Sequence, residues 1–499
     1  MPSYWITRSA VLRSIGFLYA VAFLVAALQL RPLIGADGLT PVTPYLDAVA
    51  SAQGGAWEGA LVLPSVFWAN SSDAALLGVS WLGVLGGLAV MAGLSSAWLM
   101  LLLWALYMSI VHVGQIWYGY GWETLLLEAG FLAIFLAPWR SVSSFSAQHP
   151  PPRVVIWLYR WLSFRLMIGA GLIKLRGDEC WRDLSCLVYH YQSQPNPHPL
   201  SLFFHRLPVP VHELGVLTNH VVELGLPWLL LLPRPWRSLA ALGMILFQVT
   251  LILSGNLAFL NWLSICVFLS CLEDADYLAV IPRQFRDKMR QRIEGLEGQA
   301  RAHPARVYVH GALAVMVAYL SLNVVSNLVS SEQAMNTSFD RLHLVNSYGA
   351  FGSVGRERLT VVFQGTRDAH PGADTEWKDY LYKCQPVALD ARPCWLTPYH
   401  LRLDWQVWFA PFADLRGYPW MVHMAAKLLR NDPLLLSAMG TNPFPDEAPR
   451  FVRIMEYRYR FVEPGQPGWW TREPLGEYMR PVSLEDPGFR AVLERYGWE

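Results

Sequence analysis

The chain has 499 residues, of which 54% are apolar and only 15% are charged. Soluble proteins carry charge on about a quarter of their residues, so this composition favours a membrane protein with several spans embedded in lipid. The formal net charge is +1, which excludes the strongly basic surface typical of proteins that bind nucleic acid.

Apolar runs fill most of the first two thirds of the chain, and a helix of about 17 to 25 such residues is long enough to cross a bilayer. The first run, from Ala10 to Leu30, is followed by Arg31 and Pro32. Small residues, which mark a signal-peptide cleavage site, are not found there, so we expect an uncleaved span. About nine transmembrane helices are predicted, at residues 9–30, 74–93, 96–113, 122–138, 154–175, 213–232, 238–254, 256–272 and 307–329.

Arginine and lysine gather in alternate connections between these runs, most densely between the eighth and ninth. Such connections lie on the cytoplasmic side of a membrane, so an odd number of spans places the C-terminal third outside. We therefore divide the chain into a membrane domain, residues 1–329, with an extracytoplasmic loop near 176–212, and an extracytoplasmic domain, residues 330–499. Richness in Ala, Leu, Arg and Trp suggests a bacterial cytoplasmic membrane with this domain in the periplasm; a eukaryotic source would imply the endoplasmic reticulum membrane.

The outer domain is predicted to be rich in β-structure and similar to a β-sandwich. Residues Phe451–Phe461 alternate between apolar and charged side chains, which is the period of a half-buried strand. Glu357–Gln364 and Trp377–Cys384 are expected to be further strands. Pro419–Arg430 and Pro433–Met439 are expected to be helices, the second capped by Asp432.

The loop that follows the fifth span is dense in charged, aromatic and histidine residues, and such loops are often functional. A solvated linker is the alternative. The residues proposed for the functional loop are Arg176, Asp178, Trp181, Arg182, Asp183, Tyr189, His190, Tyr191 and Gln194.

Charged side chains inside spans are costly unless they are paired or line a cavity. Glu128 is the favoured partner of Arg165, and Glu223 or His220 is the favoured partner of Lys174. Glu123 is a further intramembrane candidate, without an assigned partner. These groups either hold the helix bundle together or form a site.

The cysteines divide between the two sides of the membrane. Cys180 with Cys186, and Cys384 with Cys394, fall outside, where disulfides persist, whereas the cysteines of the eighth span are expected to be reduced. Neither a metal site nor a cofactor is predicted, because no zinc-binding or hydrolase motif is present in the sequence.

The string GLIKLRGDECWRDL, followed by HYQSQPNPHP and LTNHVVELGLP, resembles the lipase maturation factor family, membrane proteins that help secreted lipases reach an active fold. Further similar stretches are GQIWYGYGWETLLLEAGFLAIFLAPW, VNSYGAFGSVGRERLTVVFQGT, RPCWLTPYHLRLDWQVWFA and NPFPDEAPRFVRIMEYRYRF. A thinner similarity, carried by Ala170, Gly171, Lys174, Leu175 and Trp181, is to the membrane fold of the vitamin K-dependent carboxylases (HTTM). In that comparison Lys174 falls where the carboxylases have their base.

The first resemblance implies a chaperone-like assembly factor for secreted or membrane-associated clients such as lipases. Its client-binding aromatic residues would be Trp181, Tyr189, Tyr191, Trp395, Trp405 and Trp408. Each is equally compatible with a place in the core, and the core is favoured for Trp405 and Trp408. The second resemblance implies a membrane-embedded enzyme that modifies a lipid, a quinone or a polypeptide. Lys174 would be its base, with His220 and Glu223 as helpers, since a desolvated lysine can act as a base near neutral pH. A non-enzymatic maturation factor is the favoured alternative.

Overall fold

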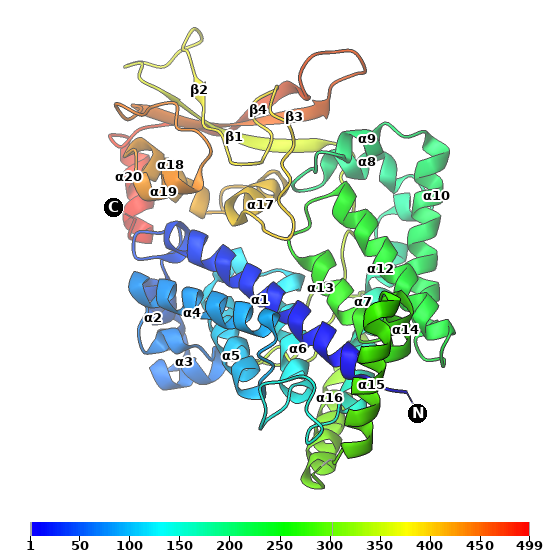
Figure 1. Ribbon diagram of the computed structural model, residues 1–499. Coiled ribbons are helices and arrows are strands. Elements are labelled where there is room, and N and C mark those ends of the chain that lie inside the picture. The colour runs from blue at the N-terminus through cyan, green and yellow to red at the C-terminus, as the bar shows by residue number, and fades with distance from the viewer. Residues whose placement is uncertain (1, 302, 499) are drawn as a thin grey trace.

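The computed structural model describes residues 2–301 and 303–498. A bundle of apolar helices carries a β-sheet and several short helices at one end (Figure 1). The apolar helices are α1 (Trp5–Ile34), α4 (Asp73–Ala92), α5 (Ala97–Val113), α6 (Gly121–Leu136), α7 (Arg153–Arg176), α10 (Val209–His220), the π-helical turn η4 (Val221–Gly225), α11 (Leu226–Leu229), α12 (Trp236–Ser254), α13 (Leu260–Leu269) and α16 (Ala305–Val329).

Five of these helices, α1, α4, α7, α12 and α16, are long and apolar enough to cross a membrane. The other predicted spans correspond to shorter helices: α5, α6, α13 and the continuous rod formed by α10, η4 and α11. The chain is thus a multi-pass membrane protein with five candidate spans of full length among the described residues.

Helices α1 and α4 approach each other closely because glycine faces glycine at their contact. A Cβ atom on Gly87 would lie 2.5 Å from the backbone nitrogen of Ala20, and one on Gly16 would lie 2.5 Å from that of Met91. Small residues allow this close approach, which is a common way for helices to associate in lipid. Helix α4 begins at the N-cap Ser72, whose hydroxyl accepts from the Ala75 N–H, and it ends at Gly93, where φ is +114°.

Short helices form the connections at the two ends of the bundle. The N-terminal end of α1 is anchored by Asp274, whose carboxylate accepts a hydrogen bond from Ser3 Oγ at 2.7 Å. The C-terminal end of α1 lies against the C-terminal third, since Gln29 Oε1 accepts a hydrogen bond from the Arg402 N–H at 2.8 Å. At the first end lie α14 (Asp274–Val280) and α15 (Arg283–Gln299); towards the other lie α2 (Val42–Gln53), α3 (Ala56–Val62), η1 (Val66–Trp68), η2 (Gln115–Tyr118), η3 (Glu179–Trp181), α8 (Cys186–Ser193) and α9 (Ser201–His205).

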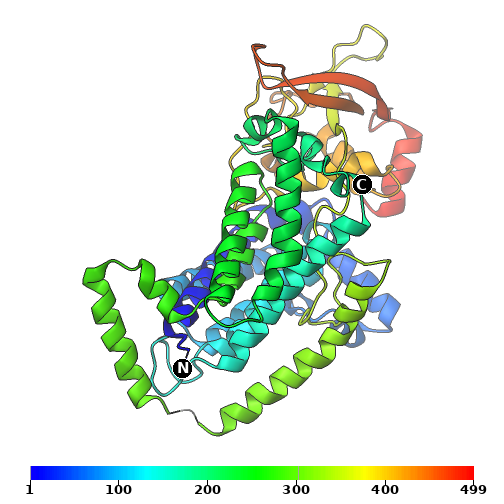
Figure 2. The same cartoon turned by 90° about the vertical axis from the view of Figure 1, so that its right-hand side faces the viewer.

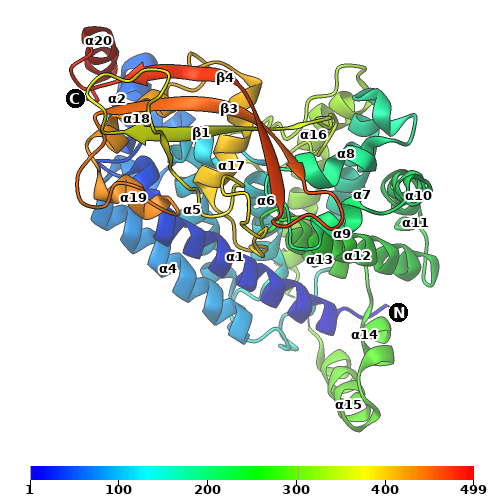
Figure 3. The same cartoon turned by 90° about the horizontal axis from the view of Figure 1, so that it is seen from above.

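The C-terminal third contains a four-stranded antiparallel sheet in the order β2-β1-β3-β4. Several of its helices lie between the sheet and the membrane helices (Figure 1), whereas the last helix of the chain lies beyond one end of the strands (Figure 3). The strands are β1 (Arg358–Thr366), β2 (Lys378–Asp379), β3 (Phe451–Phe461) and β4 (Trp470–Val482). The helices are α17 (Arg402–Phe409), η5 (Ala410–Phe412), α18 (Trp420–Leu429), α19 (Pro433–Ala438) and α20 (Pro487–Tyr496).

The prediction of a β-rich C-terminal domain is confirmed in part. One sheet covered by helices is present in the described residues, where a β-sandwich of two sheets was expected. The strand predicted at Trp377–Cys384 shortens to β2. Helix α19 begins as predicted, with the Asp432 side chain accepting from the Leu435 N–H.

Candidate functional site at the outer end of helix α7

Lys174 lies in the last turns of α7, buried against the π-helical turn η4. Its Nζ donates to Glu223 Oε1 at 2.6 Å and to Asn219 Oδ1 at 2.9 Å. The Asn219 amide in turn donates to Glu223 Oε2 at 2.9 Å. The predicted pairing of Lys174 with Glu223 is therefore confirmed, and the buried charges are matched by hydrogen bonds.

The π-helical turn has a cause in the sequence. Pro227 has no N–H, so it cannot donate to the carbonyl of Glu223 four residues earlier, and the helix widens at this turn. Gly171 of α7 makes room for the widened turn, because a Cβ atom there would lie 2.6 Å from Leu224 Cδ2 and 3.1 Å from Glu223 Cβ.

Trp181 covers this ion pair on the outer side. The Lys174 Nζ lies 4.9 Å from the centre of the indole ring, within the range of a cation–π interaction. The indole N–H donates to the Phe351 carbonyl at 2.7 Å. His220 Nε2 lies 2.8 Å from the Trp181 carbonyl oxygen, so His220 holds the loop and does not pair with Lys174.

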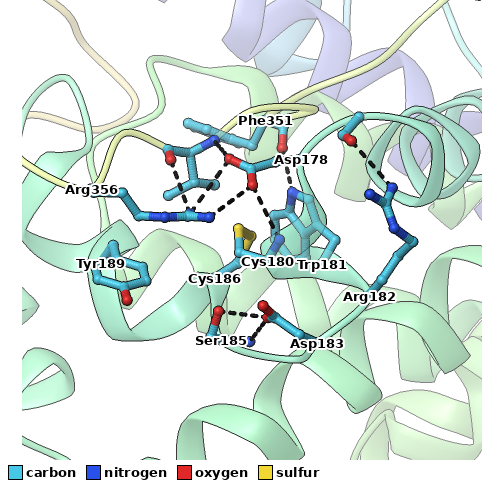
Figure 4. Close-up of a disulfide and its surroundings, with 12 residues drawn as sticks. Asp178, Cys180, Trp181, Arg182, Asp183, Ser185, Cys186, Tyr189, Phe351 and Arg356 are labelled. Atoms are coloured by element: carbon cyan, nitrogen blue, oxygen red, sulfur yellow. Dashed lines mark hydrogen bonds and ion pairs between the residues drawn. A yellow bond between two sulfur atoms is a disulfide. The ribbon is translucent and has the colours of Figure 1, made fainter.

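The loop after α7 folds around the disulfide Cys180–Cys186 (Figure 4). Both cysteines are buried, and with Trp181 and Val216 of α10 they form a small core of their own. The structure thus confirms the predicted disulfide, and it shows a compact loop where a linker was the alternative.

Asp178 ties the loop to the C-terminal third. Its carboxylate accepts from Arg356 Nη2 at 2.9 Å (Figure 4) and from the backbone N–H groups of Cys180 and Val354. Burial alone would raise the pKa of the Asp178 carboxyl, but these hydrogen bonds and the Arg356 charge lower its pKa below the ordinary value. Arg356 also lies over the ring of Tyr189.

The remaining loop residues differ in exposure. Arg182 and Asp183 are exposed: Arg182 donates to the carbonyl oxygens that end α7, and Asp183 accepts from Ser185. Arg176 donates to Gln333 Oε1 at 2.7 Å.

His190, Tyr191 and Gln194 lie on the inner face of the loop. Burial and the nearby Lys174 ammonium lower the pKa of His190 to about 4, so this imidazole is neutral at physiological pH. Tyr191 stacks on Phe204. The Gln194 amide donates to the Ser254 carbonyl at 2.9 Å.

The second predicted intramembrane pair is also present. Arg165 of α7 forms a fully buried ion pair with Glu128 of α6. Arg165 also donates to the Asn346 carbonyl at 2.9 Å, and Tyr348 donates to Glu128 Oε2 at 2.7 Å. The segment after residue 330 therefore completes the surroundings of this buried ion pair.

Glu123 has a partner that the sequence did not indicate. Its Oε1 lies 2.9 Å from Nη2 of Arg402, the first residue of α17 in the C-terminal third, and both side chains are fully buried. The Arg402 guanidinium lies 3.3 Å from the centre of the Tyr118 ring. Trp122 also donates to Glu123, at 2.8 Å.

Arg358, at the start of β1, was missed as well. It is fully buried and forms no ion pair with a carboxylate among the described residues. It donates to the carbonyl oxygens of Gln194 and Pro195 at 2.6 and 3.1 Å and to Gln385 Oε1 at 2.5 Å. A single arginine thus fixes the end of the outer loop to the sheet. An isolated arginine in a strand gives no sequence signal for such a role.

The expected client-binding aromatic residues are mostly in the core. Trp181, Tyr191 and Trp405 are buried, and Tyr189 and Trp408 are half-buried. Trp395 is 66% exposed, next to the second predicted disulfide, Cys384–Cys394, which is also present. Trp395 is therefore the most exposed ring of this set, and contact of these rings with a client stays a prediction.

The chemistry that the site supports is limited. Within residues 2–301 and 303–498, no group of three His, Cys, Asp or Glu side chains is placed to hold a metal ion. The Lys174 ammonium donates hydrogen bonds to the Glu223 carboxylate and the Asn219 amide oxygen. In this conformation Lys174 therefore serves as a buried cation that joins α7, η4 and the loop.

Comparison with known proteins covers both parts of the chain. The model of the lipase maturation factor transmembrane domain matches residues 6–279, and that of the lipase maturation factor C-terminal domain matches residues 344–480. No solved structure matches.

Curated relatives are similar over nearly the full length. Lipase maturation factor 1 of Bos taurus is 44% identical over 97% of this chain and 90% of its own length, and that of Homo sapiens is 42% identical over 99% and 91%. Lipase maturation factor 2 of Xenopus laevis is 27% identical over 100% and 85%. These animal relatives lend no support to a bacterial source or to the likeness to the carboxylases. The chain belongs to the lipase maturation factor family.

Proposed function

We propose that this protein is a membrane-embedded maturation factor for lipases, which it assists on the extracytoplasmic side, in the lumen of the endoplasmic reticulum of a eukaryotic cell. The observation that carries the proposal is the 44% identity with bovine lipase maturation factor 1 across both domains. The proposal includes nine membrane crossings, supported by a helix in each predicted apolar segment. It also includes a division into residues 1–329 and 330–499.

Trp395 is the proposed contact with a partly folded client. Its backbone is held on both sides by Asn256, which donates to the Cys394 carbonyl at 2.8 Å and accepts from the Leu396 N–H at 2.9 Å. The ring therefore projects from a fixed position, and a rigid exposed aromatic residue loses little conformational entropy when it binds. A hollow lined in part by Lys383, Cys394 and Trp470 adjoins it.

The test is co-expression with a lipase in cells that lack their own maturation factor. We expect Trp395→Ala to lower the activity of the secreted lipase at least several-fold, with an unchanged amount of the factor. The matched control is Trp57→Ala, which removes an indole that is 72% exposed on α3, outside the C-terminal domain. Equal activity of the two variants would reject Trp395 as the contact, and a lack of lipase activation by the unaltered chain would reject the function.

A further inference from the structure

Helix α15 stands apart from the helix bundle, at the end opposite the sheet. In Figure 2 it runs across the direction of α7 and α16, beside the N-terminus of the chain. It connects α14, which is fixed to the start of α1, with α16, which is a candidate span. The inference rests on the proposed topology of nine crossings, in which this end of the bundle lies on the cytoplasmic side.

The helix is amphipathic. Phe285, Met289, Ile293 and Leu296 recur at spacings of four and three residues and therefore lie on one face. Phe285 is 58% exposed, whereas Ile293 is buried. Met289 is half-buried, so the apolar face is uncovered at its N-terminal end, at Phe285.

The charged residues are arranged around that face. At 100° per residue, Arg286 and Arg292 flank the apolar stripe, and Asp287 and Glu294 lie on the opposite side of the helix. Arg292 also lies over the ring of Phe145, which anchors the C-terminal half of the helix to the loop between α6 and α7. The basic side chains of α15 are Arg283, Arg286, Lys288, Arg290 and Arg292, against the acidic Asp287, Glu294 and Glu297.

We propose that α15 lies on the cytoplasmic leaflet, inserts Phe285 between the lipids and binds anionic phospholipid headgroups through its exposed basic side chains Arg283, Lys288 and Arg290. Apolar residues bordered by basic ones are the composition of helices that bind in the membrane interface. Charge complementarity selects the anionic leaflet as the occupant, because basic segments beside a span are attracted to its negative surface potential. The tether to α16 keeps the helix at that surface.

The test uses the full-length protein, one copy in each lipid nanodisc, with an environment-sensitive fluorophore on an introduced cysteine. Phe285→Cys reports the apolar face. Gln291→Cys is the matched control, because Gln291 is exposed and uncharged and points away from the apolar stripe. The native thiols Cys266 and Cys271 are buried, so labelling is directed to the introduced site.

In discs that contain phosphatidylserine, we expect the label at position 285 to shift to shorter wavelength and to be quenched several-fold more by a spin-labelled lipid than the label at 291. In pure phosphatidylcholine, and at high salt, which screens surface charge, the difference should shrink. Equal quenching at the two positions, or quenching at 285 that does not depend on phosphatidylserine, overturns the proposal. The measurement is repeated in larger discs that hold two copies. A blue shift seen there and absent from discs with one copy would assign the apolar face to a second chain and would also overturn the proposal.

The charge can be removed without altering the apolar face. The triple variant Arg283→Gln, Lys288→Gln, Arg290→Gln with the label at 285 should lose the dependence on phosphatidylserine while it elutes in gel filtration as the parent does. Persistence of the full dependence in this variant contradicts a role for these cations.

Discussion

The ion pair between Glu123 and Arg402 offers a quantitative test of how the C-terminal third is held on the membrane helices. Arg402→Met removes the cation but leaves the Glu123 carboxylate fully buried, with hydrogen bonds from Trp122 and Tyr107. Removing one partner of a buried pair costs about 3–5 kcal/mol, because the remaining charge is uncompensated. Replacing both partners by uncharged groups of similar volume is often nearly neutral. We therefore expect Arg402→Met to lower the free energy of unfolding by about 3 kcal/mol or more, and the double variant with Glu123→Gln to recover about 2 kcal/mol of that loss.

The assay is equilibrium unfolding in mixed micelles of a mild detergent and dodecyl sulfate. The control is Arg480→Met, which removes a largely exposed partner of Asp486 at 3.6 Å and should change stability by less than about 1 kcal/mol. A loss for Arg402→Met no larger than for this control, or a double variant that recovers nothing, would refute the assignment of the pair as a buried charge contact.

Three further predictions concern other parts of the molecule. Lys174→Arg should retain most of the lipase-maturing activity, because a guanidinium can also donate to Glu223. Loss of activity at an unchanged protein level would instead indicate proton transfer by Lys174, since arginine does not deprotonate. His190 has a folded pKa of about 4 against an ordinary value of about 6.5, so the unfolded chain binds more protons between these values and stability falls as pH drops below about 6.5. The loss reaches about 2 kcal/mol at pH 5, and pH-dependent unfolding of His190→Gln should show a flatter profile in this range. Gly87→Val should sharply reduce the amount of folded protein recovered in detergent because it forces α1 and α4 apart, whereas Gly78→Val, on the same helix with no atom within 4 Å of its Cβ position, should not.

The helices were predictable because lipid requires long, nearly uncharged runs, and these are visible in the sequence. Strand β3 was predictable from the alternation of apolar and charged residues, but that alternation predicted only in part which side chains are buried. Register shifts between Ile454 and Met455 and between Glu456 and Tyr457 turn Ile454 to the core and leave Met455 half-buried. An alternating pattern does not reveal where a bulge interrupts it. The expected second sheet is replaced by helices such as α17, whose eight residues are too few to show a clear helical period.

The candidate site was likewise predictable only in part. Lys174 and Arg165 needed partners inside the bilayer, and the few carboxylates in neighbouring spans limited the choice to Glu223 and Glu128. For Trp181 the sequence left a client contact and a core position equally open, and the structure buries it in a core that the disulfide and α10 give to the loop. The sequence contains the cysteines that close this core and no local pattern that shows which helix completes it.

Three buried arginines join the parts that the sequence separates near residue 330. Arg402 reaches Glu123 of α6, Arg165 of α7 reaches the Asn346 carbonyl, and Arg358 of β1 reaches the carbonyl oxygens of the outer loop. Each guanidinium offers several donors in a rigid fork, so it fixes orientation as well as distance, which a lysine does not. Separating the C-terminal third from the membrane helices would leave the buried Glu123 carboxylate without Arg402, and it would break the hydrogen bonds that Arg165 and Arg358 make to carbonyl oxygens across this boundary. The C-terminal third is therefore fixed rather than hinged on the membrane helices.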